Sequence, residues 1–194
     1  MRPKILIILG STRQNRQGDV VAHWVAERAG RHPTADFELV DLKDWHLPFL
    51  ESPVPPAYGK YDETIRPWAA KVDSADGYLF VTPEYNHGYP AVLKNALDHL
   101  YREWGHKPAA VASYGASSGG YRAAEQLRQV FIELRMVPVR EQVGVPLVWQ
   151  AFDAQGQPHD RGLEHAADTM LNELIWWATT LKTARGTREA AAAA

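Results

Sequence analysis

Short uninterrupted apolar runs alternate along this chain with longer stretches in which apolar residues recur at the three- and four-residue spacing of a helix. The runs lack the polar alternation of a strand with one wet face, so they predict strands that helices cover on both faces. This alternation is typical of an α/β domain with a parallel sheet. The strands are expected at residues 4–9, 37–42, 77–81, 108–113 and 137–143.

The stretches between these runs predict helices that pack back on the sheet. Asp19 is expected to cap the first helix, and Asp62 or Glu63 opens the second. Pro90 stands at the start of the third, where its missing N–H is not needed. We expect one domain over residues 1–185, because no composition break divides it. For the alanine-rich residues 186–194 we expect a disordered tail or a remnant of cloning, and a frayed helix end is the other interpretation. The helical spacing covers residues 20–29, 62–75, 89–101, 124–134 and 163–181.

Composition excludes several classes of function. The chain has 194 residues, 45% of them apolar, and a net charge of -2. A nucleic-acid partner is not expected, since its binders carry a basic face. No apolar run reaches the length of a membrane span or of a signal peptide core, so we expect a cytoplasmic protein with no membrane partner. The absence of cysteine excludes disulfides and thiolate sites, and the eight histidines include no HExxH motif, so no metal site is expected.

The loop after the first expected strand has the features of a phosphate site. It reads GSTRQNRQG over residues 10–18 and ends on the N-terminus of a helix. Such an end offers unpaired N–H groups and a partial positive charge to an anion. Arg13 and Arg16 add guanidinium groups, which bind phosphate with charge-assisted hydrogen bonds. A single phosphate monoester fits this loop.

Other phosphate motifs do not fit the same loop. It lacks the Gly-Lys-Ser/Thr ending of a Walker A motif, and residues 11–13 stand where the dinucleotide fingerprint requires glycine. Asp41, at the end of the second strand, is in the position of a ribose-binding acid, but we favour a strand-end turn residue. A loop of side-chain donors around one phosphate remains, as in flavodoxin-like FMN sites.

Two more polar loops follow strands. TPEYNHGYP, over residues 82–90, follows the third expected strand, and YGASSGG, over residues 114–120, follows the fourth. The carboxyl ends of parallel strands are where ligands bind in open α/β sheets. The small residues of the second loop allow a flat ring to lie close to backbone N–H groups.

These three segments together resemble the NADPH-dependent FMN reductase family. The resemblance covers the chain up to about its final helix, and it implies a flavodoxin-like three-layer sandwich with a five-stranded parallel sheet in the order 2-1-3-4-5. It also implies FMN as cofactor and NADPH, or NADH, as hydride donor. The family usually forms dimers or tetramers through the helix after the PEYN sequence, so a homodimer or homotetramer is expected. Many relatives have Ser and Asn late in the phosphate loop, where this chain has Arg16, Gln17 and Gly18.

The resemblance also assigns residues to the cofactor. The phosphate is expected at the first loop, the isoalloxazine ring along the second and its other edge against the third, with no catalytic side chain because the flavin carries the chemistry. The expected cofactor-binding residues are Ser11, Arg13, Arg16 and Gly18; Pro83, Glu84, Tyr85, Asn86, His87 and Gly88; and Tyr114, Gly115, Ser118 and Gly119.

Two functions of different classes remain open. The first is an enzyme that reduces flavin, quinone, azo or similar small-molecule acceptors by a ping-pong hydride transfer. The second is a flavodoxin-like electron carrier or flavin-binding module without NAD(P)H turnover. The nearly neutral net charge favours the enzyme, because carriers that dock redox partners are typically strongly acidic.

One proline-rich segment has too many apolar residues for an ordinary linker. Residues 47–58 contain Phe49 and Leu50 among several prolines. Apolar side chains on a projecting loop are typical of an interface, although a loop packed on its own domain is an equal alternative. We expect this loop and the helix over residues 93–101 to contribute to the subunit contact.

Overall fold

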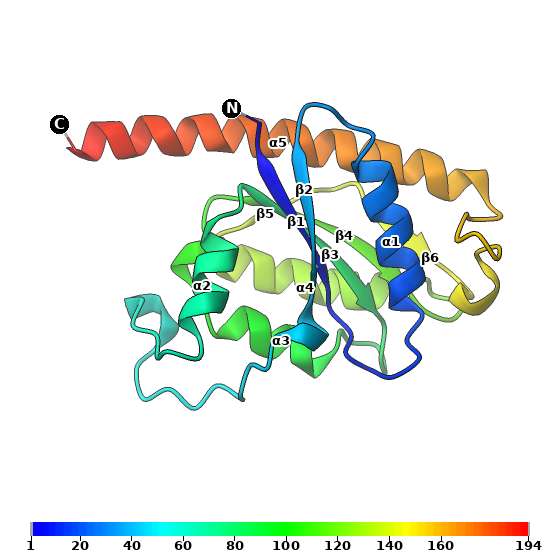
Figure 1. The fold of residues 1–194 in the computed structure, drawn as a ribbon, viewed down its shortest axis with the longest axis horizontal. Coiled ribbons are helices and arrows are strands. Elements are labelled where there is room, and N and C mark those ends of the chain that lie inside the picture. The colour runs from blue at the N-terminus through cyan, green and yellow to red at the C-terminus, as the bar shows by residue number, and fades with distance from the viewer. Residues whose placement is uncertain (1, 194) are drawn as a thin grey trace.

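The strands form one parallel sheet with helices on both faces (Figure 1). The computed structural model describes residues 2–193 and has the sheet order β2-β1-β3-β4-β5. This confirms the predicted three-layer flavodoxin-like arrangement and the order 2-1-3-4-5. The strands are β1 (Lys4–Leu9), β2 (Asp36–Asp41), β3 (Gly77–Pro83), β4 (Pro108–Tyr114), β5 (Val137–Pro138) and β6 (Val143–Val145).

Alternate residues of β1 enter two separate cores. Ile5, Ile7 and Leu9 pack with α1 and α5, whereas Leu6 and Ile8 pack with α2, α3 and α4. This two-sided burial explains why the strand sequence is apolar throughout. The helices are α1 (Gly18–Ala29), α2 (Arg66–Asp73), α3 (Ala91–Asp98), α4 (Tyr121–Glu133) and α5 (Arg161–Ala193), with short 3₁₀ segments η1 (Leu42–Asp44), η2 (Pro56–Tyr58), η3 (Arg102–Trp104) and η4 (Val148–Gln150).

The predicted strand over residues 137–143 is wrong as a single element. It is split into β5 and β6, which pair with the beginning and the end of β4. Pro138 has no N–H to continue the ladder. Between the two pieces, Arg128 of α4 donates to the carbonyls of Val139 (2.7 Å) and Arg140 (3.0 Å). A side chain from another element therefore satisfies the backbone where the strand is interrupted.

The first helix begins earlier than the sequence indicates. Gln17 is the N-cap residue of α1 and makes no side-chain cap bond, so the prediction of Asp19 as cap is wrong. Asp19 lies in the first turn and pairs with Arg16 instead. At its other end α1 is joined to α5, since Arg28 donates to Asp168 (2.6 Å) and to Glu164 (3.2 Å).

The last helix is much longer than its apolar pattern. In Figure 1 α5 crosses one face of the sheet, and its final turns project past the sheet on the side where the N-terminus lies. The helix continues through Ala193, so the expected boundary at residue 185 is not marked by a break in it. Among residues 2–193, no helix combines the length and the apolar composition needed to cross a bilayer.

Candidate active site

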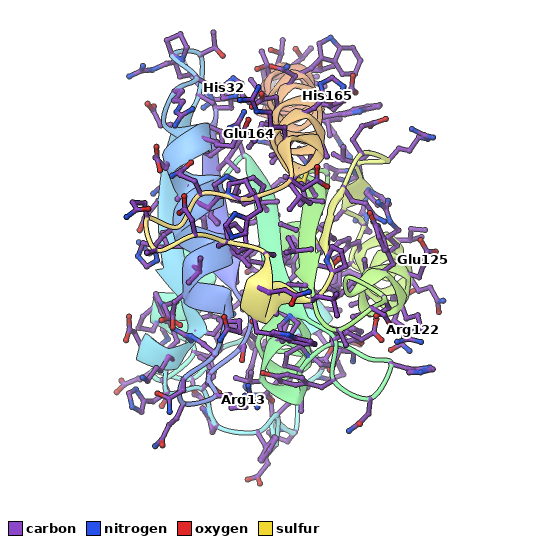
Figure 2. The ribbon with its side chains drawn as sticks, turned by 90° about the vertical axis from the view of Figure 1, so that its right-hand side faces the viewer. Arg13, His32, Arg122, Glu125, Glu164 and His165 are labelled. Carbon is purple, nitrogen blue, oxygen red and sulfur yellow. The ribbon has the colours of Figure 1, made fainter. Side chains whose placement is uncertain are left out.

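Three loops meet at the carboxyl ends of β1, β3 and β4, which are neighbours in the sheet. The Ser11 hydroxyl of the first loop lies 2.8 Å from the Tyr85 hydroxyl of the second. The Arg13 guanidinium lies 5.9 Å from the centre of the Tyr85 ring, within cation–π range. Figure 2 shows Arg13 beyond this end of the strands, with His32 at the opposite end of the molecule. The loops predicted to bind one ligand are therefore adjacent.

The first loop presents backbone donors at the start of α1. Within the described residues, the amides of Thr12, Gln14 and Asn15 donate to no protein acceptor. Asn15 has a φ of 52°, a left-handed conformation that Asn adopts more easily than most residues. Together with the N-terminal N–H groups of α1, these amides form a site suited to an anion.

Arg16, predicted to bind the cofactor, is engaged with protein partners in this structure. Its side chain is 5% exposed and donates from Nε to Asp19 (2.9 Å), from one terminal nitrogen to Asp41 (2.8 Å) and the Ser11 carbonyl, and from the other to both carboxylates. Every N–H of the guanidinium is thereby used. These bonds raise the pKa of Arg16, with Asp41 as the largest cause. In this arrangement Arg16 has no donor left for a phosphate.

Asp41 is a strand-end residue, as favoured from the sequence, with one further partner. Its carboxylate caps η1 by accepting from the Lys43 amide (2.9 Å). Burial raises the pKa of Asp41, but the hydrogen bond from Arg16 and the one from Lys43 outweigh burial, so this pKa lies below its ordinary value. The Asp19–Arg16–Asp41 cluster ties the first loop to β2 and α1.

The second loop contains a tight turn with both central residues in the left-handed region. Asn86 has a φ of 49° and His87 a φ of 70°, and Tyr85 and Gly88 exchange backbone hydrogen bonds of 2.8 and 3.0 Å across the turn. Asn86 and His87 are both exposed. Within the part of the chain that the structure describes, the amides of Asn86 and His87 donate to no protein group.

Two residues of α4 hold the second loop in place. Arg122 donates to Glu84 from Nε (2.6 Å) and through its backbone amide (3.2 Å), and Gln126 donates to the His87 carbonyl (3.0 Å). The Glu84 side chain is 5% exposed. Burial raises the pKa of Glu84, but the hydrogen bonds from Arg122 and Ser118 outweigh burial and keep it below its ordinary value. Glu84 is thus an ionised link between the second loop and α4, which Figure 2 shows carrying Arg122 and Glu125.

The third loop brings backbone donors to the same place. Gly119 and Gly120 have φ values of 60° and 83°, and a Cβ on Gly120 would lie 2.7 Å from the Tyr114 amide nitrogen. Only glycine fits the second position without displacing the backbone. Gly115 is fixed by donating to the Val145 carbonyl (3.1 Å). The amides of residues 116–118 find no acceptor within residues 2–193, so they remain available to a ligand.

A buried hydroxyl supports the fit of a phosphate-bearing cofactor. Tyr114 is 4% exposed, and its hydroxyl has no hydrogen-bond partner in the described structure. The hydroxyl lies beneath the start of α1, where a Cβ on Gly18 would be 2.3 Å from it. Buried hydroxyls are rarely left unpaired in folded proteins, so this one indicates a missing ligand or water. Gly18 makes room for this hydroxyl. The donor-rich loops and the unpaired hydroxyl are consistent with FMN.

The structure brings some of the predicted cofactor-binding residues together and engages others with protein partners. Ser11, Arg13, Tyr85 and Tyr114 lie at the junction of the loops, whereas Arg16 and Glu84 are engaged with protein partners. Arg122 and Gln126 were not predicted, because nothing in their spacing reveals which loop a helix side chain reaches. No group of three or more potential metal ligands forms within the described residues.

An open sheet of order 2-1-3-4-5 with donor-rich loops at its carboxyl edge defines a flavodoxin-like class of flavin-binding fold. A flavodoxin from Bacillus cereus shares this fold (TM-score 0.55, 18% identity, 89% of this chain and 97% of that chain). Residues 3–150 match the family described as NADPH-dependent FMN reductase, and the chain belongs to that family. The protein is accordingly an NAD(P)H-dependent oxidoreductase with FMN as cofactor, and the predicted enzyme reading is confirmed over the electron carrier.

Sequence similarity to individual FMN reductases covers most of the chain. An NAD(P)H-dependent FMN reductase of Schizosaccharomyces pombe is 45% identical over 149 residues (74% of each chain), and one of Pseudomonas aeruginosa is 32% identical over 189 residues (90% of this chain, 96% of that protein). A 2-hydroxy-1,4-benzoquinone reductase of a Burkholderia species is 34% identical over 143 residues (71% and 74%). Among solved structures, the NAD(P)H:(acceptor) oxidoreductase FerB of Paracoccus denitrificans has the same fold (TM-score 0.73, 21% identity, covering 92% of this chain and 98% of that one).

Proposed function

We propose that this enzyme uses NAD(P)H to reduce small exchangeable acceptors, quinones and free flavin among them, at a single open face of bound FMN. The observation that carries the proposal is the junction of three donor-rich loops around the unpaired Tyr114 hydroxyl. A relative named as a benzoquinone reductase supports quinones as the acceptor class. Azo compounds belong to the same proposal, and the choice between NADPH and NADH needs a direct comparison of rates.

We propose that each of the three loops binds a different part of FMN. Arg13 and the amides of residues 12–15 hold the phosphate, since the Arg16 donors are already used. Pro83, Asn86, His87 and Gly88 lie along the ring, with the Asn86 and His87 amides stabilising negative charge that develops there. Gly115, Ser118 and Gly119 close the other edge. Bound here, FMN would supply the hydride and electron transfer between NAD(P)H and the acceptor, and these residues would hold and orient it.

The opening of the proposed flavin site is bordered by side chains that discriminate little among acceptors. Tyr85 is 36% exposed, and His87 and Tyr89 flank the same turn. These groups present apolar or amphipathic surfaces without a fixed charge that would recognise one acceptor. A face that admits donor and acceptor in turn has to stay open, so a broad acceptor range follows.

Steady-state kinetics test the proposal. With FMN-saturated protein, initial rates at varied NADPH and varied quinone are expected to give parallel double-reciprocal lines, because the two substrates use one face in turn. Intersecting lines would show that both bind together and would contradict the shared face. An absence of NAD(P)H oxidation with every acceptor would contradict the enzyme itself.

We also infer a homo-oligomer, although on narrower grounds than the sequence indicated. Leu93 and Leu97 of α3, and Leu100 just after it, are at most 1% exposed within the protomer, so this apolar stripe belongs to the protomer's own core. The loop over residues 47–58 is the stronger candidate, since Phe49 remains 76% exposed and Tyr58 64%. The expected cytoplasmic location stays a prediction.

A further inference from the structure

A second hollow lies at the opposite end of the sheet from the flavin loops. It has a volume of about 710 Å³ and is formed at the amino ends of β3 and β4, by the turn before β4 and by the end of α4. The final turns of α5, which project past the sheet in Figure 1, form its remaining wall. The proposed function uses none of these residues.

Positive charge dominates this hollow, although the chain as a whole has a net charge of -2. Asp76 is fully engaged, since it accepts from Lys182 (2.7 Å), from Arg185 (2.6 Å) and from the Lys4 amide (3.0 Å). The Asp73 side chain is 73% exposed and lies 3.8 Å from Lys107. Of the side chains that the structure describes, these are the two carboxylates that line the hollow, whereas its cationic side chains are Arg102, Lys107, Arg135, Lys182, Arg185 and Arg188.

Three guanidinium groups converge on one neutral residue. The His106 Nε2 accepts from Arg135 (2.7 Å) and from Arg188 (3.3 Å), and the His106 carbonyl accepts from Arg185 (2.8 Å). Burial lowers the pKa of His106, and the nearby arginines lower it further. Neither Arg135 nor Arg188 forms an ion pair with a described carboxylate. Both line the hollow, so among the side chains that the structure describes each retains donors there without an anion to balance them.

The buried Lys107 at this site also has mainly neutral hydrogen-bond acceptors around its ammonium group. Lys107 is 5% exposed and donates to the carbonyls of Asp73 (3.0 Å) and Val72 (3.4 Å). Burial is the main cause that lowers the pKa of Lys107 to about 8. An anion in the hollow would favour the charged form of both Lys107 and His106.

We propose that this hollow binds a small phosphate-bearing anion, such as a pyrophosphate or the phosphate ester of a small metabolite, with Arg135 and Arg188 as its principal ligands. Guanidinium groups match phosphate oxygens with paired hydrogen bonds. A volume of about 710 Å³ admits more than a phosphate alone. The confinement of the cations to one concave site favours a small ligand over a nucleic-acid strand, which needs an extended basic surface.

Calorimetric titration with pyrophosphate tests the site. The protein is saturated with FMN, so that its phosphate loop is filled, and is titrated at low ionic strength. The Arg135→Ala/Arg188→Ala variant is expected to bind pyrophosphate at least tenfold more weakly than wild type. Arg140→Ala, which removes one guanidinium whose side chain is 91% exposed outside the hollow, is the matched control and is expected to change the affinity less than twofold.

Further variants separate this site from the flavin site and from a folding defect. Arg13→Ala is expected to leave pyrophosphate binding unchanged once FMN is saturating. Arg188→Gln alone, on an exposed turn of α5, is expected to weaken binding without lowering the melting temperature. Equal affinity in wild type and the double variant, or no wild-type binding below millimolar pyrophosphate, would overturn the proposal. A second result would also overturn it: a wild-type dimer that does not bind pyrophosphate and is not disrupted by it, together with a double variant that is monomeric. A second copy of the chain would then occupy the hollow.

Discussion

Arg13 and Arg16 stand three positions apart in one loop, yet their guanidinium groups have different neighbours. Arg13 is exposed above the Tyr85 ring, whereas Arg16 is enclosed by Asp19 and Asp41. A guanidinium whose donors are all satisfied stabilises the loop itself. We therefore propose that Arg13, and not Arg16, acts on the cofactor phosphate.

We expect Arg13→Ala to weaken FMN binding about tenfold or more, because a charged hydrogen bond contributes about 1.5–3 kcal/mol. Fluorescence titration measures this, and riboflavin is the control ligand, since without a phosphate it should bind wild type and Arg13→Ala equally. Arg16→Ala is expected to lower the free energy of unfolding. An Arg16→Ala protein that folds normally but loses FMN affinity would reinstate Arg16 as a phosphate ligand.

The Arg16–Asp41 pair predicts a pH dependence of stability. The pKa of Asp41 is lowered in the folded state, so its stabilisation is complete above the unfolded value of about 3.9 and is lost as pH falls through the folded value. In urea unfolding from pH 7 to pH 3, the difference between wild type and Asp41→Asn should shrink toward acid. Asp36→Asn, a 56% exposed position on the same strand, serves as control and should show little difference at any pH.

From the sequence, the backbone turns of the candidate site could be predicted better than the partners of its side chains. The glycines and the Asn86–His87 turn are readable from sequence, because unusual backbone conformations demand particular residues. Whether Arg16 faces a ligand or two carboxylates is not readable, since Asp41 lies on another strand and only the sheet brings it near. The unpaired Tyr114 hydroxyl is likewise a property of packing.

At the scale of elements, the link between the second loop and α4 sets the shape of the flavin site. Glu84 and Arg122 are 38 positions apart, and their ion pair joins the turn over residues 85–88 to the helix that follows the third loop. The order of the predicted strands and helices is confirmed, but the first helix begins earlier, the last helix is longer, and the fifth strand is interrupted where Arg128 binds the backbone carbonyls. Such long side-chain bridges leave no periodic signal in the sequence.

We expect Arg122→Ala to raise the dissociation constants of FMN and riboflavin alike, by about threefold to tenfold, because we propose that the second loop lines the ring and not the phosphate. This separates it from Arg13→Ala, which affects FMN alone. A double-mutant cycle with Glu84→Gln provides the control: the two changes should be non-additive, since either one breaks the pair. Additive effects, or no effect on riboflavin, would show that the loop does not depend on this link.

At the scale of the whole molecule, the exposed loop over residues 47–58 is held in place by α3. Asn95 donates to the Pro48 carbonyl (2.8 Å) and accepts from the Leu50 amide (3.1 Å), which holds Phe49 in solvent. Fixed apolar groups in water are typical of a subunit interface. Both the loop and α3 stay predictions as subunit contacts. The burial of the α3 stripe in its own core could not be read from the sequence, because a helical stripe looks the same whether it covers a sheet or a partner.

We expect Phe49→Asp to shift the protein toward monomer in sedimentation velocity, because a charge at the contact is costly to bury. The control is Ile132→Asp, which places the same charge at a 65% exposed apolar site on α4. This variant should sediment as wild type does. A wild-type protein that is only monomeric at micromolar concentration would contradict the interface.

The position of α5 has a consequence for how the chain is made. The family match ends at residue 150, yet Ala167, Met170 and Leu174 of α5 are fully buried against the sheet. During synthesis α5 leaves the ribosome after every strand of the sheet, so the part of this apolar face that α1 does not cover stays exposed until residues 161–178 have emerged. Such surfaces make nascent proteins prone to aggregate and dependent on chaperones. A chain stopped after residue 160 should accumulate as aggregates in cells, whereas one stopped after residue 185 should fold.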